Sequence, residues 1–165
     1  MKRREFIKNA GILSLASYMP KSNASIQDIV ALSLDGDEII LDSVDILDFM
    51  SSFQGSVITK EHYDYDSARL VWNGVWDKQP ALIVFCESVV DIQQAINFAR
   101  EQNLLTAVRG GGHSISGKST CDGGIIIDLS RMRKTSVDLQ RKIVTVEPGC
   151  TLYDLDSKTL PYGYV

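Results

Sequence analysis

The sequence predicts an α+β fold with an α/β-type core, in which a βαβ unit is followed by further strands. Residues 81–86 form a continuous apolar run, which is typical of a strand buried on both faces of a sheet. A helix is predicted next, because apolar residues then recur at helical spacing; they are Val89, Ile92, Ala95, Ile96 and Ala99. Residues 104–108 form the returning strand, and residues 125–129 and 142–146 predict two more.

Capping signals mark the starts of two helices. Ser88 stands before the first helix with Asp91 at the capping-box position, and Thr151 stands before a helix through residue 160 with Asp154 in the same place. In both boxes aspartate replaces the more usual glutamate. We expect Asp128 to end its strand rather than to bind a ligand, and residues 138–141 to connect strands 125–129 and 142–146 as a hairpin.

Upstream of this core the pattern is weaker. A turn is predicted at residues 35–37, a short helix near residues 46–50, a strand at 55–59 and a helix at 65–73. Trp72 and Trp76 are interpreted as packing residues, because large aromatic side chains mostly bury area. A length of 165 residues, with 44% hydrophobic and 23% charged residues, is that of one ordinary globular domain.

The candidate site is the glycine-rich stretch that follows residues 104–108. Gly110, Gly111 and Gly112 remove every Cβ where that strand ends, so their N–H groups can converge on an anion. Arg109 adds a cation beside them, and His113 adds a nucleophilic imidazole. The stretch therefore predicts a phosphate cradle that carries one reactive side chain.

A P-loop is the competing interpretation of the same residues. Residues 112–119 satisfy the pattern G-x-x-x-x-G-K-[ST], and residues 125–128 imitate an apolar run ending in a Mg²⁺-binding aspartate. A P-loop requires a helix that begins at Lys118, and Gly123 and Gly124 would stop one after about a turn. The strand expected at residue 125 also follows too soon for a crossover of about a dozen residues between parallel strands. The P-loop is therefore disfavoured.

Three motifs in order carry a family resemblance. They are RGGGHSxxG at residues 109–117, CDGGxxIDLSxM at 121–132 and VxPG at 146–149. The series resembles the FAD-binding domain of berberine-bridge-enzyme-like oxidoreductases, which belong to the vanillyl-alcohol-oxidase or PCMH-type superfamily. The resemblance runs from about residue 57 to residue 165, so we expect residues 56–165 to form this domain, cut short on its C-terminal side, after an extension at residues 25–55.

The resemblance implies that FAD is the cofactor and that its pyrophosphate lies in the glycine loop. The implied cofactor-binding residues are Arg109, Gly110, Gly111, Gly112, His113, Ser114, Ile115, Ser116 and Gly117. It also implies a covalent bond from His113 to the 8α-methyl group of the flavin. For Ser114 and Ser116, hydrogen bonds within the loop and contacts to the ligand are equally open.

By the same resemblance, the complete enzyme would oxidise an alcohol or sugar by hydride transfer to flavin, and its small-molecule substrate would bind through a later part. No residue here is a candidate catalytic acid or base. A truncated fragment, or an FAD-binding module without its own catalysis, is the alternative. The three cysteines, Cys86, Cys121 and Cys150, lack metal-type spacing, so no metal site is expected.

Residues 1–24 predict a twin-arginine-type signal peptide. Arg3 and Arg4 open an R-R-x-F-I-K stretch, residues 10–19 are modestly apolar, and cleavage is expected after Ala24. An amphipathic N-terminal helix or membrane anchor is the alternative. Cleavage would remove five of the seventeen basic and one of the twenty-one acidic side chains, leaving a net charge of −8. We therefore expect an exported, periplasmic or secreted protein with no membrane span in its mature chain and no nucleic-acid partner.

Overall fold

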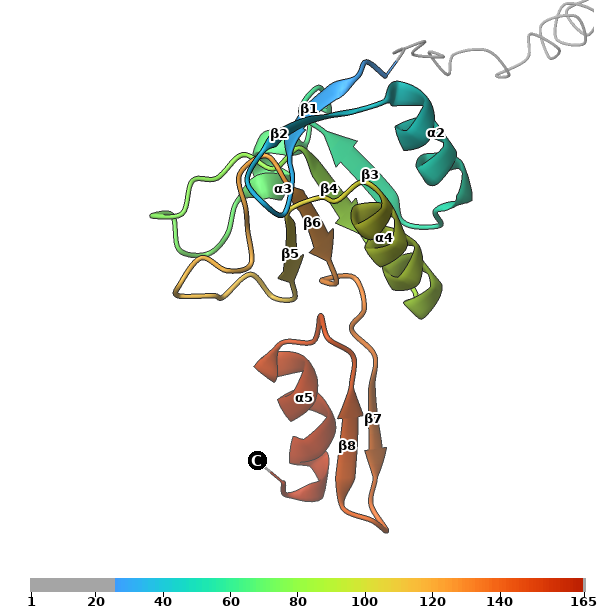
Figure 1. The fold of residues 1–165 in the computed structure, drawn as a ribbon. Coiled ribbons are helices and arrows are strands. Elements are labelled where there is room, and N and C mark those ends of the chain that lie inside the picture. Colours follow the sequence, from blue (N-terminus) through green and yellow to red (C-terminus); the bar gives the residue numbers. More distant parts are fainter. Residues whose placement is uncertain (1–25, 165) are drawn as a thin grey trace, which may run out of the picture.

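The computed structural model describes residues 26–164 (Figure 1). The signal-peptide prediction for residues 1–24 lies outside this range. A four-stranded sheet has the order β3-β4-β6-β5, with β3 at Ser56–Thr59, β4 at Leu82–Phe85, β6 at Ile125–Asp128 and β5 at Thr106–Arg109. Strands β4, β6 and β5 are parallel, and β3 pairs antiparallel with β4. The α+β class is confirmed.

Both faces of the central strands are buried, as their apolar sequences require. Leu82 and Val84 face the main hydrophobic cluster, whereas Ile83 between them faces a second cluster with Tyr65 and Ile126. This division follows from the alternation of side chains along a strand. The main cluster lies under two helices and the second lies under α3, Tyr65–Arg69, so the sheet has protein on both sides.

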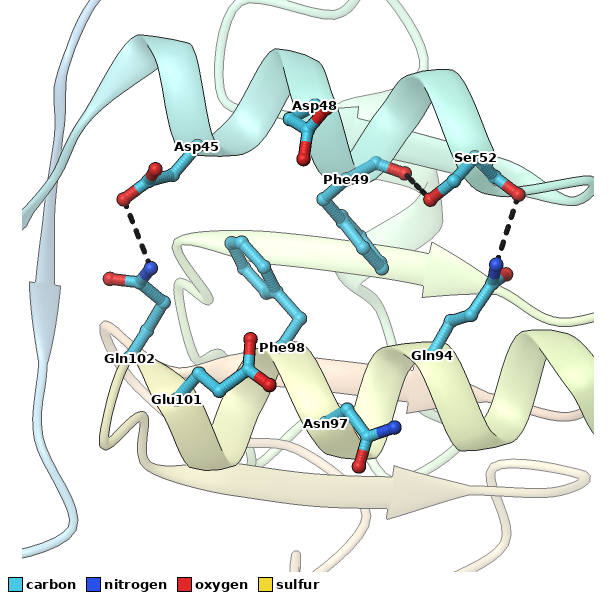
Figure 2. Close-up of a pocket in the computed structure, with 9 residues that line it drawn as sticks. All are labelled: Asp45, Asp48, Phe49, Ser52, Gln94, Asn97, Phe98, Glu101 and Gln102. Atoms are coloured by element: carbon cyan, nitrogen blue, oxygen red, sulfur yellow. Dashed lines mark hydrogen bonds between the residues drawn. The ribbon is translucent and has the colours of Figure 1, made fainter.

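Helices α2, Ser43–Ser52, and α4, Val89–Glu101, cover the face of the main cluster side by side (Figure 1). Between them the rings of Phe49 and Phe98 stack with centroids 4.4 Å apart. Figure 2 shows these rings pointing toward one another in a shallow groove between the helices, which carries acidic side chains along its rim. The described part of the chain holds no group of three or more side chains placed to bind a metal ion.

The predicted βαβ crossover exists, but its two strands do not pair. Helix α4 joins β4 to β5, and β6 lies between these strands, parallel to both. The expectation that the strand at residue 125 follows too soon to run parallel to β5 was therefore wrong. Residues 110–124 make the return without a helix. They suffice because a coil spans about 3.3 Å per residue, whereas a helix spans about 1.5 Å.

The N-terminal extension contributes to the same core. Strands β1, Ile29–Leu32, and β2, Glu38–Leu41, form a hairpin whose turn includes Gly36 at φ +87°, within the predicted turn at residues 35–37. Ala31 and Leu41 of this hairpin are almost fully buried against the sheet. Among residues 26–164, no helix has the length and apolar character needed to span a membrane.

The C-terminal unit consists of β7, Thr135–Asp138, β8, Ile143–Val146, and α5, Leu152–Thr159, followed by a short 3₁₀ turn at Leu160–Tyr162 (Figure 1). Strand β7 was not predicted from the sequence, so the hairpin was assigned to the wrong pair of strands. Residues 138–141 connect β7 to β8, and the preceding strand is β6 of the main sheet. Strand β7 went unseen because its sequence, TSVD, holds one apolar residue.

Both predicted capping boxes are present. In the box that begins at Ser88, the aspartate, Asp91, is fully buried. Asp91 accepts hydrogen bonds from the backbone N–H groups of Ser88 and Glu87, and from that of Gln54 at 3.1 Å. Burial alone would raise the pKa of Asp91, but these hydrogen bonds outweigh it, so its pKa lies below the ordinary 3.8. One carboxylate thus joins the start of α4 to the end of α2.

We expect Asp91→Asn to lower the free energy of unfolding by about 1–3 kcal/mol at neutral pH. Both carboxylate oxygens of Asp91 accept hydrogen bonds, whereas asparagine has a single acceptor oxygen. Since the folded pKa is lowered, this contribution is complete above pH 3.8 and is lost as the pH falls through the folded value. Urea titrations across pH measure it. Asp48→Asn, on the exposed face of α2, is the control and should change little. An equal loss in both variants would contradict the assignment.

Candidate functional site

The glycine loop leaves the sheet at the carboxyl end of β5 and runs beside the segment around residue 75 (Figure 1). No helix begins at Lys118, and residues 110–124 contain only turns and bends. The P-loop interpretation therefore lacks the helix N-terminus that would hold a nucleotide phosphate. This agrees with the expectation from the sequence, although one of the two reasons given for it was wrong.

Two glycines of the loop are required by close approaches. A Cβ on Gly110 would lie 2.7 Å from the carbonyl oxygen of Pro148, which brings the C-terminal unit against the start of the loop. A Cβ on Gly117 would lie 2.3 Å from the indole of Trp76, and Gly117 also has φ +67°. The first and last glycines of the motif therefore serve packing, whereas Gly111 borders the candidate ligand site.

The loop presents a run of free backbone donors. Within residues 26–164, none of the N–H groups from residue 110 to residue 116 donates a hydrogen bond to another protein group. Successive unpaired N–H groups in a turn favour anions. The hydroxyl of Ser114 accepts a bond from the N–H of Lys118 at 3.2 Å and lies 3.5 Å from that of Ser116. Ser114 thus makes the loop-stabilising bond; ligand contact by either serine stays a prediction.

Arg109 is buried, and its guanidinium has partners within the protein. It pairs with Asp128, which lies opposite it in the parallel register of β5 and β6, and donates to the carbonyl oxygens of Ala68 at 2.6 Å and Leu70 at 3.3 Å. The side chains of Arg109 and Asp128 are only 6% and 2% exposed. In the structure the positive charge of Arg109 is paired with Asp128. The expected contact between Arg109 and a bound phosphate stays a prediction.

His113 is exposed and lies on one wall of a cavity of about 660 Å³. Its ring stacks on that of Trp72, with centroids 5.8 Å apart and planes inclined by 24°. Gly111 and His113 form the loop side of the cavity. The other side comes from the C-terminal unit, through Val146, Cys150, Thr151, Leu152, Tyr153 and Leu155. This second wall was not predicted from the sequence.

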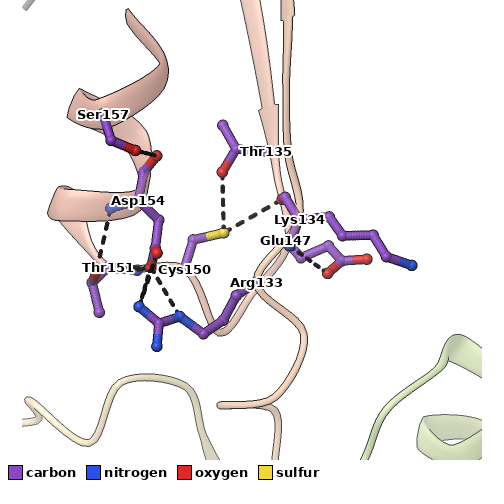
Figure 3. Close-up of polar contacts among 8 residues, drawn as sticks. All are labelled: Arg133, Lys134, Thr135, Glu147, Cys150, Thr151, Asp154 and Ser157. Atoms are coloured by element: carbon purple, nitrogen blue, oxygen red, sulfur yellow. Dashed lines mark hydrogen bonds and ion pairs between the residues drawn. The ribbon is translucent and has the colours of Figure 1, made fainter. Parts of the chain in front are cut away.

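A polar network fixes the second wall (Figure 3). Arg133 donates to both carboxylate oxygens of Asp154, and Asp154 also accepts from the N–H and hydroxyl of Thr151 at the start of α5. Hydrogen bonds from Thr151, and then the Arg133 guanidinium, lower the pKa of Asp154 to about 2. The cap of α5 is therefore retained through the mildly acidic range.

The cysteines differ in their surroundings. Burial raises the pKa of the Cys86 thiol to about 12 and that of Cys121 to about 11, so both remain protonated at neutral pH. Cys150 is partly exposed at the cavity and donates through Sγ to the carbonyl oxygen of Lys134, 3.4 Å away (Figure 3).

Comparisons with known proteins identify the fold and cofactor. A family model described as FAD binding domain matches residues 80–165, which is about half of the chain. The chain belongs to this FAD-binding family. Among its relatives, an FAD-linked oxidoreductase of Dictyostelium discoideum is 39% identical over 117 residues, which cover 70% of this chain and 25% of the relative. FAD is therefore the cofactor, as the sequence predicted.

Solved structures agree with this assignment. The FAD-binding chain matches 6-hydroxy-D-nicotine oxidase from Arthrobacter nicotinovorans with a TM-score of 0.65 and 31% identity, over 68% of this chain and 25% of that one. BBE-like 1 of Physcomitrella patens, at 23% identity and a TM-score of 0.66, covers 72% and 26% and shows the same fold. The resemblance to vanillyl-alcohol-oxidase and berberine-bridge-enzyme-like proteins is confirmed. The chain spans about a quarter of the length of these relatives.

The residues of the site fit FAD. The free N–H groups of the loop suit the pyrophosphate, and a cavity of about 660 Å³ lies in the usual range for cofactor sites. The lining of the cavity beyond the loop is mainly apolar, which suits an aromatic ring system. Loop and cavity meet at Gly111 and His113.

Replacing Arg109 tests how much its buried ion pair with Asp128 contributes to stability. Arg109→Met leaves the Asp128 carboxylate buried and unpaired, and we expect the free energy of unfolding to fall by about 3–5 kcal/mol. The control is Arg131→Met, which breaks the half-exposed pair with Glu87 and the contact with the ring of Phe85. This control should cost about 1 kcal/mol. Chemical denaturation measures both; similar losses would show that burial of the Arg109 pair does not matter.

Proposed function

We propose that the chain is the FAD-binding part of an FAD-dependent oxidoreductase in which His113 carries the flavin. The observation that supports this most directly is the position of His113. Its exposed imidazole lies where a run of free N–H groups meets a cavity of about 660 Å³. The covalent bond from His113 to the flavin methyl group rests on the family resemblance together with this position.

In this proposal, different residues bind the pyrophosphate and the ring system of FAD. The N–H groups of residues 110–116 bind the pyrophosphate, and the apolar side of the cavity, with Leu152 and Tyr153, excludes water from the ring system. When bound, FAD supplies the two-electron acceptor for the hydride of the substrate. Arg109 holds the first residue of the loop in place through Asp128.

The substrate class proposed for the complete enzyme is an alcohol or a sugar. It rests on the resemblance alone, and one relative, (R)-6-hydroxynicotine oxidase of Paenarthrobacter nicotinovorans, is named for a nitrogen heterocycle. The chain covers 24% of that relative. In our proposal, the groups that select a substrate therefore belong to a part of the enzyme outside these residues. The expected net charge of −8 on the mature chain argues against nucleic acid as a partner.

Acid denaturation of the complete gene product that contains these residues tests the link to His113. We expect the wild-type precipitate to stay yellow and the His113→Ala precipitate to be colourless, because the alanine has no nitrogen to bond the flavin. His62→Ala, which changes the other histidine of the chain, is the matched control and should stay yellow. Absorbance of the washed precipitate measures retained flavin. Colour that persists in His113→Ala would place the bond elsewhere, and a colourless wild type would make the association non-covalent.

We also propose that the protein is exported by the twin-arginine route, which accepts folded proteins and so permits FAD to bind before export. The support is the sequence of residues 1–24. Replacing Arg3 and Arg4 with lysine keeps the charge but removes the paired guanidinium groups, so the uncut precursor should accumulate inside the cell. Fractionation and N-terminal sequencing measure this. Lys8→Arg is the control; unchanged export of the paired variant would refute the route.

A further inference from the structure

We propose that Trp72 is a positioning residue for His113, holding the plane of the imidazole in the orientation that meets the flavin. The inference rests on the proposed function of His113 and adds a residue that neither the motifs nor the comparisons single out. It depends on three sets of contacts, which fix the backbone of Trp72, the segment around it and the ring of His113.

The exposure of Trp72 is the first observation. Its side chain is 76% exposed, so residues 26–164 do not give Trp72 the buried packing position expected from the sequence. The helix predicted over residues 65–73 ends at Arg69, and Leu70 is already extended. Because the Trp72 ring stays exposed, it adds little hydrophobic stabilisation to the fold. Its one stacked aromatic contact among the described residues is with His113.

The backbone of Trp72 is anchored to the protein core. Two residues before it, the carbonyl oxygen of Leu70 accepts from the buried guanidinium of Arg109, as does that of Ala68. The N–H of Trp72 itself donates to the carbonyl oxygen of Gly112, 3.2 Å away. Gly112 directly precedes His113, so the two stacked side chains leave backbones that are joined by a hydrogen bond.

The far end of the segment is tied to the same loop. The side chains of Asn73 and Trp76 both donate to the carbonyl oxygen of Ile115, at 3.3 and 2.9 Å. The indole of Trp76 also fills the space where Gly117 lacks a Cβ. Residues 68–76 therefore follow the glycine loop from its first residue to its last, and Trp72 lies between the two attachments.

This geometry determines what the stack does. Centroids 5.8 Å apart with planes inclined by 24° are within the range of favourable aromatic pairs. An exposed imidazole held only by its own backbone would rotate freely about its side-chain bonds and would lose that freedom when it meets the flavin. The indole restricts this rotation beforehand, which is the advantage of orientation in a reaction between two bound groups.

Proton NMR of the full chain tests the orientation without any cofactor. The chain has two histidines, and His62 stacks on Tyr63 as His113 stacks on Trp72, which provides a matched pair. We expect Trp72→Ala to shift the ring protons of His113 downfield and to leave those of His62 unchanged. Tyr63→Ala should do the reverse. Unchanged His113 signals in Trp72→Ala would overturn the proposal.

Flavin attachment to the complete gene product tests the consequence. We expect attachment to the apoprotein given FAD to be about 10²-fold slower in Trp72→Ala, and close to wild type in Trp72→Phe, which keeps an aromatic face. In the His113→Ala background, Trp72→Ala should leave the Kd for FAD unchanged. A weaker Kd there would make Trp72 a direct flavin contact and would overturn its role through His113. A wild type without acid-stable flavin would refute the covalent link at His113, and the NMR comparison would still decide the role of Trp72.

Discussion

The buried pair between Arg109 and Asp128 connects the sheet, the start of the glycine loop and residues 68–70. Arg109 ends β5, Asp128 ends β6, and the two residues lie opposite one another. The ion pair therefore links the ends of two parallel strands at the point where the glycine loop begins. The same guanidinium holds the carbonyl oxygens of residues 68–70, which lead into Trp72. A buried charge that lost its partner would be costly, so this arrangement tolerates little movement. The loop therefore starts from a fixed point although the N–H groups of residues 110–116 donate no hydrogen bond to the described protein.

That combination suits a cofactor site. A loop whose donors are bonded internally would have to break those bonds before binding an anion, whereas residues 110–116 keep their N–H groups free. Besides the bonds that Ser114 accepts from Gly117 and Lys118, the loop is held through the carbonyl oxygens of Gly112 and Ile115, which accept from residues 72, 73 and 76. Acceptors of the loop are used for structure, and its donors remain available for FAD.

The sequence predicted the parts of the fold that depend on local pattern. The apolar runs in β4 and β6, the boxes at Ser88 and Thr151, and the loop at the end of β5 were all recognised. It failed where partners distant in the chain decide the outcome. The insertion of β6 between β4 and β5, the pairing of Arg109 with Asp128, and the exposure of Trp72 depend on which residues meet in space. No spacing rule reports these contacts.

The two glycine-containing motifs also explain how the cavity acquires its second wall. Gly110 lets the carbonyl oxygen of Pro148 approach the loop, and a Cβ on Gly149 would lie 2.1 Å from the carbonyl oxygen of Leu129, just after β6. Each glycine thus permits backbone to pack on backbone where any side chain would intervene. The C-terminal unit is held against the ends of β5 and β6 at these two points, and its capped helix α5 then faces His113 across the cavity. The VxPG motif therefore belongs to the site through packing, although none of its polar groups need touch FAD.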